Sequence, residues 1–110
     1  MSQLFKENCI NLDESSQLCT ADEVKLFLGD LDSWSIVFDG MEKLERVFRF
    51  NTFAEALKFT NQIANEAEQQ GHHPKLTTEW GKVTVSWWTH FLGGLHKNDF
   101  IMAARTDSLY

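Results

Sequence analysis

The sequence places one long helical pattern between two pairs of strand-like segments. Thr52-Phe-Ala-Glu55 is a capping-box pattern, and an apolar stripe follows it at helical spacing as far as Gly71, a residue suited to the left-handed end of a helix. We therefore predict a helix over residues 52–71. The residues of the stripe are Phe53, Ala56, Leu57, Thr60, Ile63, Ala64 and Ala67.

Strand-like segments flank this helix on both sides. Within them, bulky apolar residues alternate with other residues, as expected when one face of a strand is buried. Within each pair, a glycine-containing turn separates the two segments, which is typical of a β-hairpin. The segments cover residues 34–38 and 43–50, with a turn at Asp39-Gly40, and residues 75–80 and 82–90, with a turn at Gly81.

Shorter helical patterns complete the domain. Thr20-Ala-Asp-Glu23 is another capping-box pattern and opens a helix predicted over residues 21–31, and a last helix is predicted from about residue 97. The resulting order is αββαββα. Because the strands come in hairpins and do not alternate singly with helices, we predict an α+β fold, a four-stranded antiparallel sheet with three helices on one face.

Length and composition limit the chain to one domain. The 110 residues include nine Phe and four Trp, which supply enough apolar area for a single core. Residues 1–19 are polar and lack periodicity, so we expect an irregular N-terminal leader without chemistry, followed by the folded domain at residues 20–110. The net charge of −6, with scattered basic residues, argues against direct nucleic-acid binding.

Cysteine usage and hydropathy indicate a cytoplasmic protein. Cys9 and Cys19 lack Cys-x-x-Cys spacing, so reduced thiols are expected, without a disulfide framework or a thiolate metal site. The sequence has no apolar run of the roughly 18 residues needed to span a membrane, and it begins without the basic-then-apolar order of a secretory signal. We expect cytoplasmic localisation and no membrane association.

Three histidines and two carboxylates fall where this topology brings segments together. They are Glu68, His72, His73, His90 and Asp99. Glu68 precedes His72 by four residues, so its carboxylate is expected to approach that imidazole across the last helical turn. Pro74 holds its predecessor extended, and adjacent side chains of an extended segment point apart. We therefore expect His72 and His73 to have different duties.

Each of these residues also has a purely structural interpretation. Asp99, in the first turn of the last helix, would complement the helix dipole without a catalytic role. His72-His73 would form a polar turn, and His90 would end a strand. His96 has no evident partner and is expected to be solvated. Trp88 points away from the helices in the predicted sheet, where it would form an oligomer contact or a ligand wall.

The spacing of seven residues resembles that of the pterin-4a-carbinolamine dehydratase family. An acid is followed after three residues by His-His-Pro, after five more by an aromatic residue, after nine more by a histidine and after eight more by an aspartate. Flanking segments such as Gly93-Gly94-Leu95 extend the resemblance, and the family's αββαββα order matches the predicted one. The seven residues are Glu68, His72, His73, Pro74, Trp80, His90 and Asp99.

The resemblance implies a hydro-lyase that converts a 4a-hydroxytetrahydropterin into a quinonoid dihydropterin and water during recycling of the pterin cofactor. It implies that His72 and His90 are the acid–base pair at the C4a hydroxyl, and that His73 holds the pterin and contributes to proton transfer. No metal and no bound cofactor are expected. Substrate-binding roles are expected for Glu68, Pro74, Thr89, Phe91 and Asp99.

Three positions depart from the family's common pattern. Lys75 follows His-His-Pro, and Phe91 follows the later histidine, where many relatives have an acid. His96 stands where many relatives begin the last helix with Ser or Thr, so we expect a weaker helix cap. None of these departures removes an expected proton carrier.

Other functions compete with the enzyme. Relatives of this fold act as coactivator dimerisation partners or as carboxylase assembly factors, although a purely structural descendant would be free to lose the histidines. A Zn²⁺ or Fe²⁺ site is disfavoured because His72 and His73 are expected to diverge. An open sheet face and four Trp favour self-association, and the resemblance implies a homodimer or homotetramer. The sequence leaves open a metabolic link to an aromatic amino acid hydroxylase.

Overall fold

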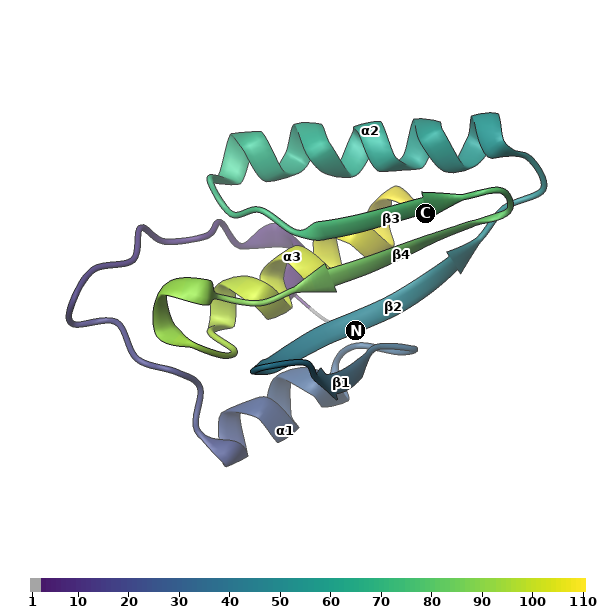
Figure 1. The fold of residues 1–110 in the computed structure, drawn as a ribbon. Helices are drawn as coiled ribbons and strands as arrows, with labels where there is room; N and C mark the ends of the chain where they lie inside the picture. The colour runs from purple at the N-terminus through teal and green to yellow at the C-terminus, as the bar shows by residue number, and fades with distance from the viewer. Residues whose placement is uncertain (1–2) are drawn as a thin grey trace.

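In the computed structural model, which describes residues 3–110, two β-hairpins join side by side into one sheet (Figure 1). The strands are β1 (Ser35–Phe38), β2 (Glu42–Arg49), β3 (Lys75–Glu79) and β4 (Lys82–Trp87), and their spatial order is β1-β2-β4-β3 with every neighbouring pair antiparallel. The helices are α1 (Ala21–Gly29), α2 (Phe53–Gln70) and α3 (Lys97–Leu109). The predicted α+β fold and its αββαββα order are confirmed.

The register of the central strands gathers their buried side chains on one face. Phe48 of β2 pairs with Val83 of β4, and Trp87 lies further along β4 on the same face. Helix α2 lies against this face, because the ring of Phe59 is 4.8 Å from that of Phe48. Helix α3 lies there too, because the Trp87 indole N–H donates to the Thr106 hydroxyl at 3.1 Å.

Helix α1 packs beside α3 and ends earlier than predicted. Its capping box is present, since Thr20 and Glu23 each bond the other's backbone amide. The ring of Phe27 lies 5.4 Å from that of Phe100 on α3. The helix ends at Gly29, two residues short of the predicted end. The Leu31 amide bonds back to Leu28 in a tighter i→i+3 turn, and the Leu31 side chain enters the core.

Helix α2 is confirmed over almost its predicted length, but its buried stripe differs. Thr52 caps it by accepting from the Glu55 amide, and Gly71 ends it with a left-handed φ of 65°. The predicted stripe is wrong at Phe53 and Leu57, which are 47% and 43% exposed. It also omitted Phe59, which is buried because the sheet lies on that side. The buried residues of α2 are Ala56, Phe59, Ile63 and Ala67.

The leader is held against the ends of α2 and α3. Leu4, in a short 3-10 turn at Leu4–Lys6, is buried in the core. The Arg105 guanidinium of α3 donates to the carbonyl of Glu7, and the side-chain oxygen of Gln70 accepts from the Cys9 amide at 2.7 Å. The leader therefore has fixed contacts although it has little regular structure.

Two expectations from the sequence concern the cysteines, expected as reduced thiols, and the absence of a membrane-spanning helix. Cys9 and Cys19 are free thiols, and burial raises the pKa of each to about 11. Among residues 3–110, no helix combines the length and the apolar character that crossing a membrane requires.

Candidate active site

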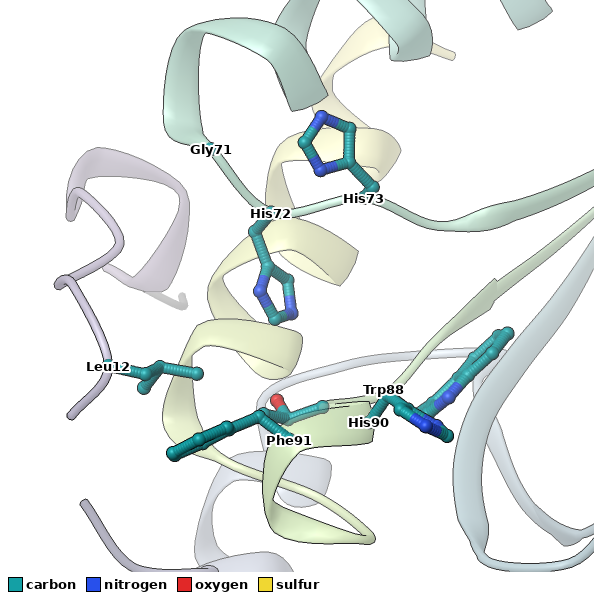
Figure 2. A pocket seen from close by; sticks show the side chains of 8 residues that line it. Leu12, Gly71, His72, His73, Trp88, His90 and Phe91 are labelled. Atoms are coloured by element: carbon teal, nitrogen blue, oxygen red, sulfur yellow. The ribbon is translucent and has the colours of Figure 1, made fainter. Parts of the chain in front are cut away.

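A pocket of about 250 Å³ opens between the segment that enters β3 and the turn that follows β4 (Figure 2). Its walls come from the leader, from the end of α2 and from the residues after β4. The predicted His72, His73 and His90 all line it. The full lining is Leu12, Gly71, His72, His73, Trp88, Thr89, His90 and Phe91.

His72 is a buried imidazole paired with a buried carboxylate. It is 8% exposed, and its Nε2 lies 2.5 Å from Oδ1 of Asp99, which is 0% exposed. The second Asp99 oxygen accepts from the Thr89 hydroxyl at 2.8 Å and from the His96 amide at 2.9 Å. The N-terminus of α3 also favours a negative charge at Asp99. The carboxylate is thus satisfied by protein donors and fixes the His72 ring.

A stacking contact restrains the same ring from another direction. The His72 imidazole lies nearly parallel to the Trp87 indole, with an interplanar angle of 9° and centroids 5.9 Å apart. Trp87 is itself fully buried, and its indole N–H is bonded to Thr106 of α3. His72 therefore has one orientation defined by both a hydrogen bond and a packed aromatic neighbour.

His73 has the opposite environment. Its side chain is 60% exposed and pairs with Glu68 at 2.9 Å, and Glu68 is itself 78% exposed. The prediction that Glu68 approaches His72 is therefore wrong. Gly71 ends the helix in a left-handed conformation, so His72 turns inward and His73 is the ring that reaches back to Glu68. Figure 2 shows the two rings pointing away from each other, as expected for adjacent residues in an extended segment.

His90 lies in a turn, beyond the end of the strand. Strand β4 ends at Trp87, and a 3-10 turn at His90–Leu92 follows and is closed by Gly93 with φ 78°. The preceding Thr89 pairs with Gly94 in an isolated bridge, which anchors the base of the turn. The predicted strand over residues 82–90 is thus three residues too long. Although the predicted strand end is wrong, His90 lines the pocket as expected, and its side chain is exposed.

The expected substrate-binding residues divide into two groups. Thr89 and Phe91 line the pocket, and Phe91 is 66% exposed there. Glu68, Pro74 and Asp99 are not among the lining residues. Asp99 is buried, and its carboxylate is bonded to two residues that do line the pocket, His72 and Thr89.

His96 is a residue whose role sequence analysis missed. It is 9% exposed, and its Nδ1 accepts from the Asn98 amide at 3.0 Å. The backbone amide of His96 in turn donates to the Asp99 carboxylate. The expectation of a solvated side chain is therefore wrong, and the expected weak cap is replaced by a complete capping box at the start of α3. Burial is the main cause that lowers the pKa of His96, and the nearby charge of Asp99 opposes it.

Trp88 and Leu12 form walls of the pocket. Trp88 was expected to be an oligomer contact or a ligand wall; it lines the pocket, and the Lys43 ammonium lies 4.0 Å from its ring centroid. Leu12 comes from the leader, where no function was expected. Its place in the pocket depends on a long-range contact that leaves no local signal in the sequence.

The side chains near the pocket do not gather in the manner of a metal site. Within the described residues 3–110, no three or more His, Cys, Asp and Glu side chains are arranged to hold an ion. The site instead offers one fixed imidazole, two exposed imidazoles and aromatic walls. Such a set can move protons to and from a flat ligand.

Comparisons with known proteins give a consistent picture. The family model described as pterin 4 alpha carbinolamine dehydratase matches residues 17–109. Proteins named "Putative pterin-4-alpha-carbinolamine dehydratase" from Marinobacter nauticus and Chlorobium limicola are 52% and 49% identical, over 100% of this chain and 100% and 98% of their own lengths.

Solved structures share the fold. A transcriptional coactivator/pterin dehydratase from Brucella melitensis is 33% identical with a TM-score of 0.78, and the match covers 84% of this chain and 98% of the other. A pterin dehydratase-like protein identified as a RuBisCO assembly factor in the alpha-carboxysome is 24% identical with a TM-score of 0.60, covering 70% and 88%. At that identity the second likeness concerns the fold alone.

Proposed function

The chain belongs to the pterin 4 alpha carbinolamine dehydratase family, and from this membership we propose how its pocket removes water from a 4a-hydroxytetrahydropterin. The reaction breaks the bond between C4a and the hydroxyl oxygen, and a ring N–H loses its proton as a C=N bond forms. One proton must reach the departing hydroxyl and one must leave the ring. The enzyme is a hydro-lyase acting on pterins.

The observation that carries the proposal is that His72, His73 and His90 all line one pocket. An imidazole with an ordinary pKa of about 6.5 supplies both its acid and its base form near neutral pH. His72 and His90 are assigned to the proton transfers at C4a, and His73 to holding the pterin and assisting them. A protonated imidazole delivers its proton to the hydroxyl, so water leaves; a neutral imidazole accepts the ring proton.

The different surroundings of the histidines support different duties. Asp99 engages Nε2 of His72, which leaves Nδ1 as the nitrogen of that ring for exchange with a ligand. His90 and His73 are exposed, so bulk water can return them to their starting protonation states after each turnover. Glu68 is assigned to orienting His73. Pro74 is assigned to shaping the segment on which both rings are carried.

The size and the walls of the pocket fit a compact planar ligand. Its volume of about 250 Å³ lies below the roughly 300–1,000 Å³ of pockets for drug-sized molecules. Trp88 and Phe91 offer flat apolar surfaces, and the hydroxyl of the buried Thr89 at the base is already bonded to Asp99. These features favour a bicyclic heterocycle over a larger ligand.

The proposal extends to the domain, the location and the oligomeric state of the chain. We assign the catalytic domain to residues 20–110, supported by a family match that begins at residue 17. We propose a cytoplasmic location, and exposed aromatic side chains such as Phe38 and Trp80, which are 79% and 75% exposed, support a homodimer or homotetramer. Light scattering on the purified chain would measure the oligomeric state.

The experiment that tests the proposal follows dehydration of a 4a-hydroxytetrahydropterin by absorbance, after subtraction of the uncatalysed rate. His72→Ala and His90→Ala should each lower kcat by about 100- to 10,000-fold, the range typical of a positioned acid or base. Gln69→Ala, exposed beside Glu68 on α2, is the control and should retain the wild-type rate. Wild-type rates in both histidine variants would overturn the mechanism. No turnover by the wild type would favour a non-catalytic assembly or coactivator role on this fold.

A further inference from the structure

The leader passes beside the pocket between two anchored points. On the N-terminal side, the side chain of Asn98 forms two hydrogen bonds with the backbone of Ile10: its oxygen accepts from the amide at 3.0 Å and its nitrogen donates to the carbonyl at 2.9 Å. Asn98 is 2% exposed and belongs to the first turn of α3. The strap, as we call residues 10–19, is thus fastened next to Asp99.

On the C-terminal side, a turn and a backbone bond fix the strap again. Asp13 accepts from the amide and the hydroxyl of Ser15, and the Ser16 amide bonds the Asp13 carbonyl. The Cys19 amide then donates to the carbonyl of Leu95 at 2.8 Å. The strap therefore cannot move freely across the pocket.

Leu12 lies between these anchors and faces the pocket. It is the leader's contribution to the lining, and in Figure 2 its side chain points toward the space below His72, on the side away from Trp88. Ile10, two residues earlier, does not line the pocket and is 62% exposed. Two apolar residues of the strap thus differ in whether they meet the pocket.

We propose that Leu12 is a substrate-positioning residue, an apolar wall that contacts the pterin on the side opposite Trp88, and that Asn98 acts through the strap to hold it there. The inference rests on the proposed function and extends it to the strap. Most of the strap, including Leu12, lies before the family match, which begins at residue 17. A flat ring needs support on both faces to present C4a to His72 and His90. An isobutyl group supplies that support and displaces water without competing for the pterin's polar edge.

The test compares Leu12→Ala with Ile10→Ala by steady-state dehydration of a 4a-hydroxytetrahydropterin. Losing an apolar contact at a ligand site costs about tenfold or more in discrimination, and a wall that is partly open to solvent belongs at the low end of that effect. Leu12→Ala should therefore raise KM about five- to tenfold with kcat changed less than about twofold, because the contact is made equally in ground and transition states. Leu12→Met should recover most of the wild-type KM. Ile10→Ala should match the wild type.

A second variant tests the role of Asn98. Asn98→Asp keeps the shape but replaces the donor to the Ile10 carbonyl with an oxygen, so it should loosen the strap and raise KM in the same way. The double variant with Leu12→Ala should be no worse than the poorer single variant, since both changes act through one wall. Thermal unfolding verifies that each variant is folded.

The outcomes separate this inference from the proposed function. If the wild type dehydrates the substrate but Leu12→Ala and Ile10→Ala have the same KM, Leu12 is not a wall of the working site. A fall in kcat alone in Leu12→Ala would also overturn the assignment. If the wild type itself shows no dehydration, the proposed function fails, and binding of a dihydropterin measured by Trp fluorescence still tests whether Leu12 contacts a pterin.

Discussion

Asp99 performs two tasks with a single carboxylate. One oxygen holds His72, and the other accepts from Thr89 and from the His96 amide at the start of α3. Sequence analysis offered the helix-dipole role and the functional role as alternatives. The structure shows that both uses of the side chain are compatible, because a carboxylate has lone pairs for several donors.

Replacing Asp99 should therefore affect the chemistry of His72. Asp99→Asn removes the charge that orients and stabilises the imidazole, and kcat should fall about 10- to 100-fold, within the contribution of one positioned acid or base. KM should change much less than kcat, because Asp99 does not line the pocket. Steady-state kinetics measure both constants.

A comparison of kcat with KM also distinguishes positioning from simple destabilisation. Thr89→Ser retains the hydroxyl that donates to Asp99 and serves as a matched change in the same network. Its kcat should stay close to the wild-type value. An Asp99→Asn protein that is folded and has an unchanged kcat would show that His72 does not depend on this carboxylate.

At the scale of the elements, helix α3 begins with an unusual cap. Ser, Thr, Asp and Asn are the preferred N-cap residues, so His96 was expected to cap poorly. In the structure, Nδ1 of its imidazole accepts from the Asn98 amide, and Asp99 completes the box. Protonation would place a hydrogen on Nδ1 and remove this acceptor.

Stability should therefore depend on the protonation of His96. Burial lowers its pKa below the ordinary value of about 6.5. Between the lowered pKa and 6.5 the unfolded chain binds more protons than the folded chain, so the free energy of unfolding rises with pH in that window. The contribution is fully present above about pH 6.5 and is lost as pH falls through the folded pKa. Urea unfolding at a series of pH values measures this dependence.

His96→Ser isolates this effect from the other histidines. Serine keeps an N-cap acceptor but does not titrate, so the variant should lose less stability than the wild type between about pH 7 and pH 5. His96→Ala should lose the cap at every pH, at a cost of about 1 kcal/mol. Parallel pH curves for the wild type and His96→Ser would contradict the cap's dependence on a neutral imidazole.

At the scale of the whole molecule, one aromatic cluster joins the sheet, α2 and the C-terminus. The ring of Phe59 lies 4.8 Å from Phe48, 5.2 Å from Phe50 and 5.7 Å from Tyr110. The Tyr110 hydroxyl also donates to the carbonyl of Arg49 at 2.9 Å. The cluster lies toward the N-terminal half of α2, whereas the pocket lies beyond its C-terminal end.

The global stability of the fold should depend strongly on Phe59. Phe59→Ala should lower the free energy of unfolding by about 3–5 kcal/mol, because it leaves a cavity in a packed core. Phe53→Ala removes the same atoms from the same helix, but Phe53 is 47% exposed and the loss should be under about 1 kcal/mol. Denaturant unfolding of both variants compares them directly. Equal losses would show that the observed face of α2 is not the one that is buried.

The sequence by itself determined the elements and their order. The capping residues at Thr20 and Thr52 and the glycine at position 71 act within one helical turn, and strand alternation is equally local. The spacing from Glu68 to Asp99 also indicated which histidines share the pocket. Short-range patterns of this kind are legible because the interactions they encode join residues close in sequence.

Only the tertiary structure decided which side chains meet. The choice of His73 over His72 as the partner of Glu68 followed from the direction in which Gly71 releases the chain, and the burial of Phe59 followed from the side on which the sheet lies. The position of Leu12 depends on Asn98, a residue 86 positions later in the chain whose side chain binds the backbone of Ile10, 88 positions away from it. Such contacts depend on the packing of distant segments, and local propensity carries no information about them.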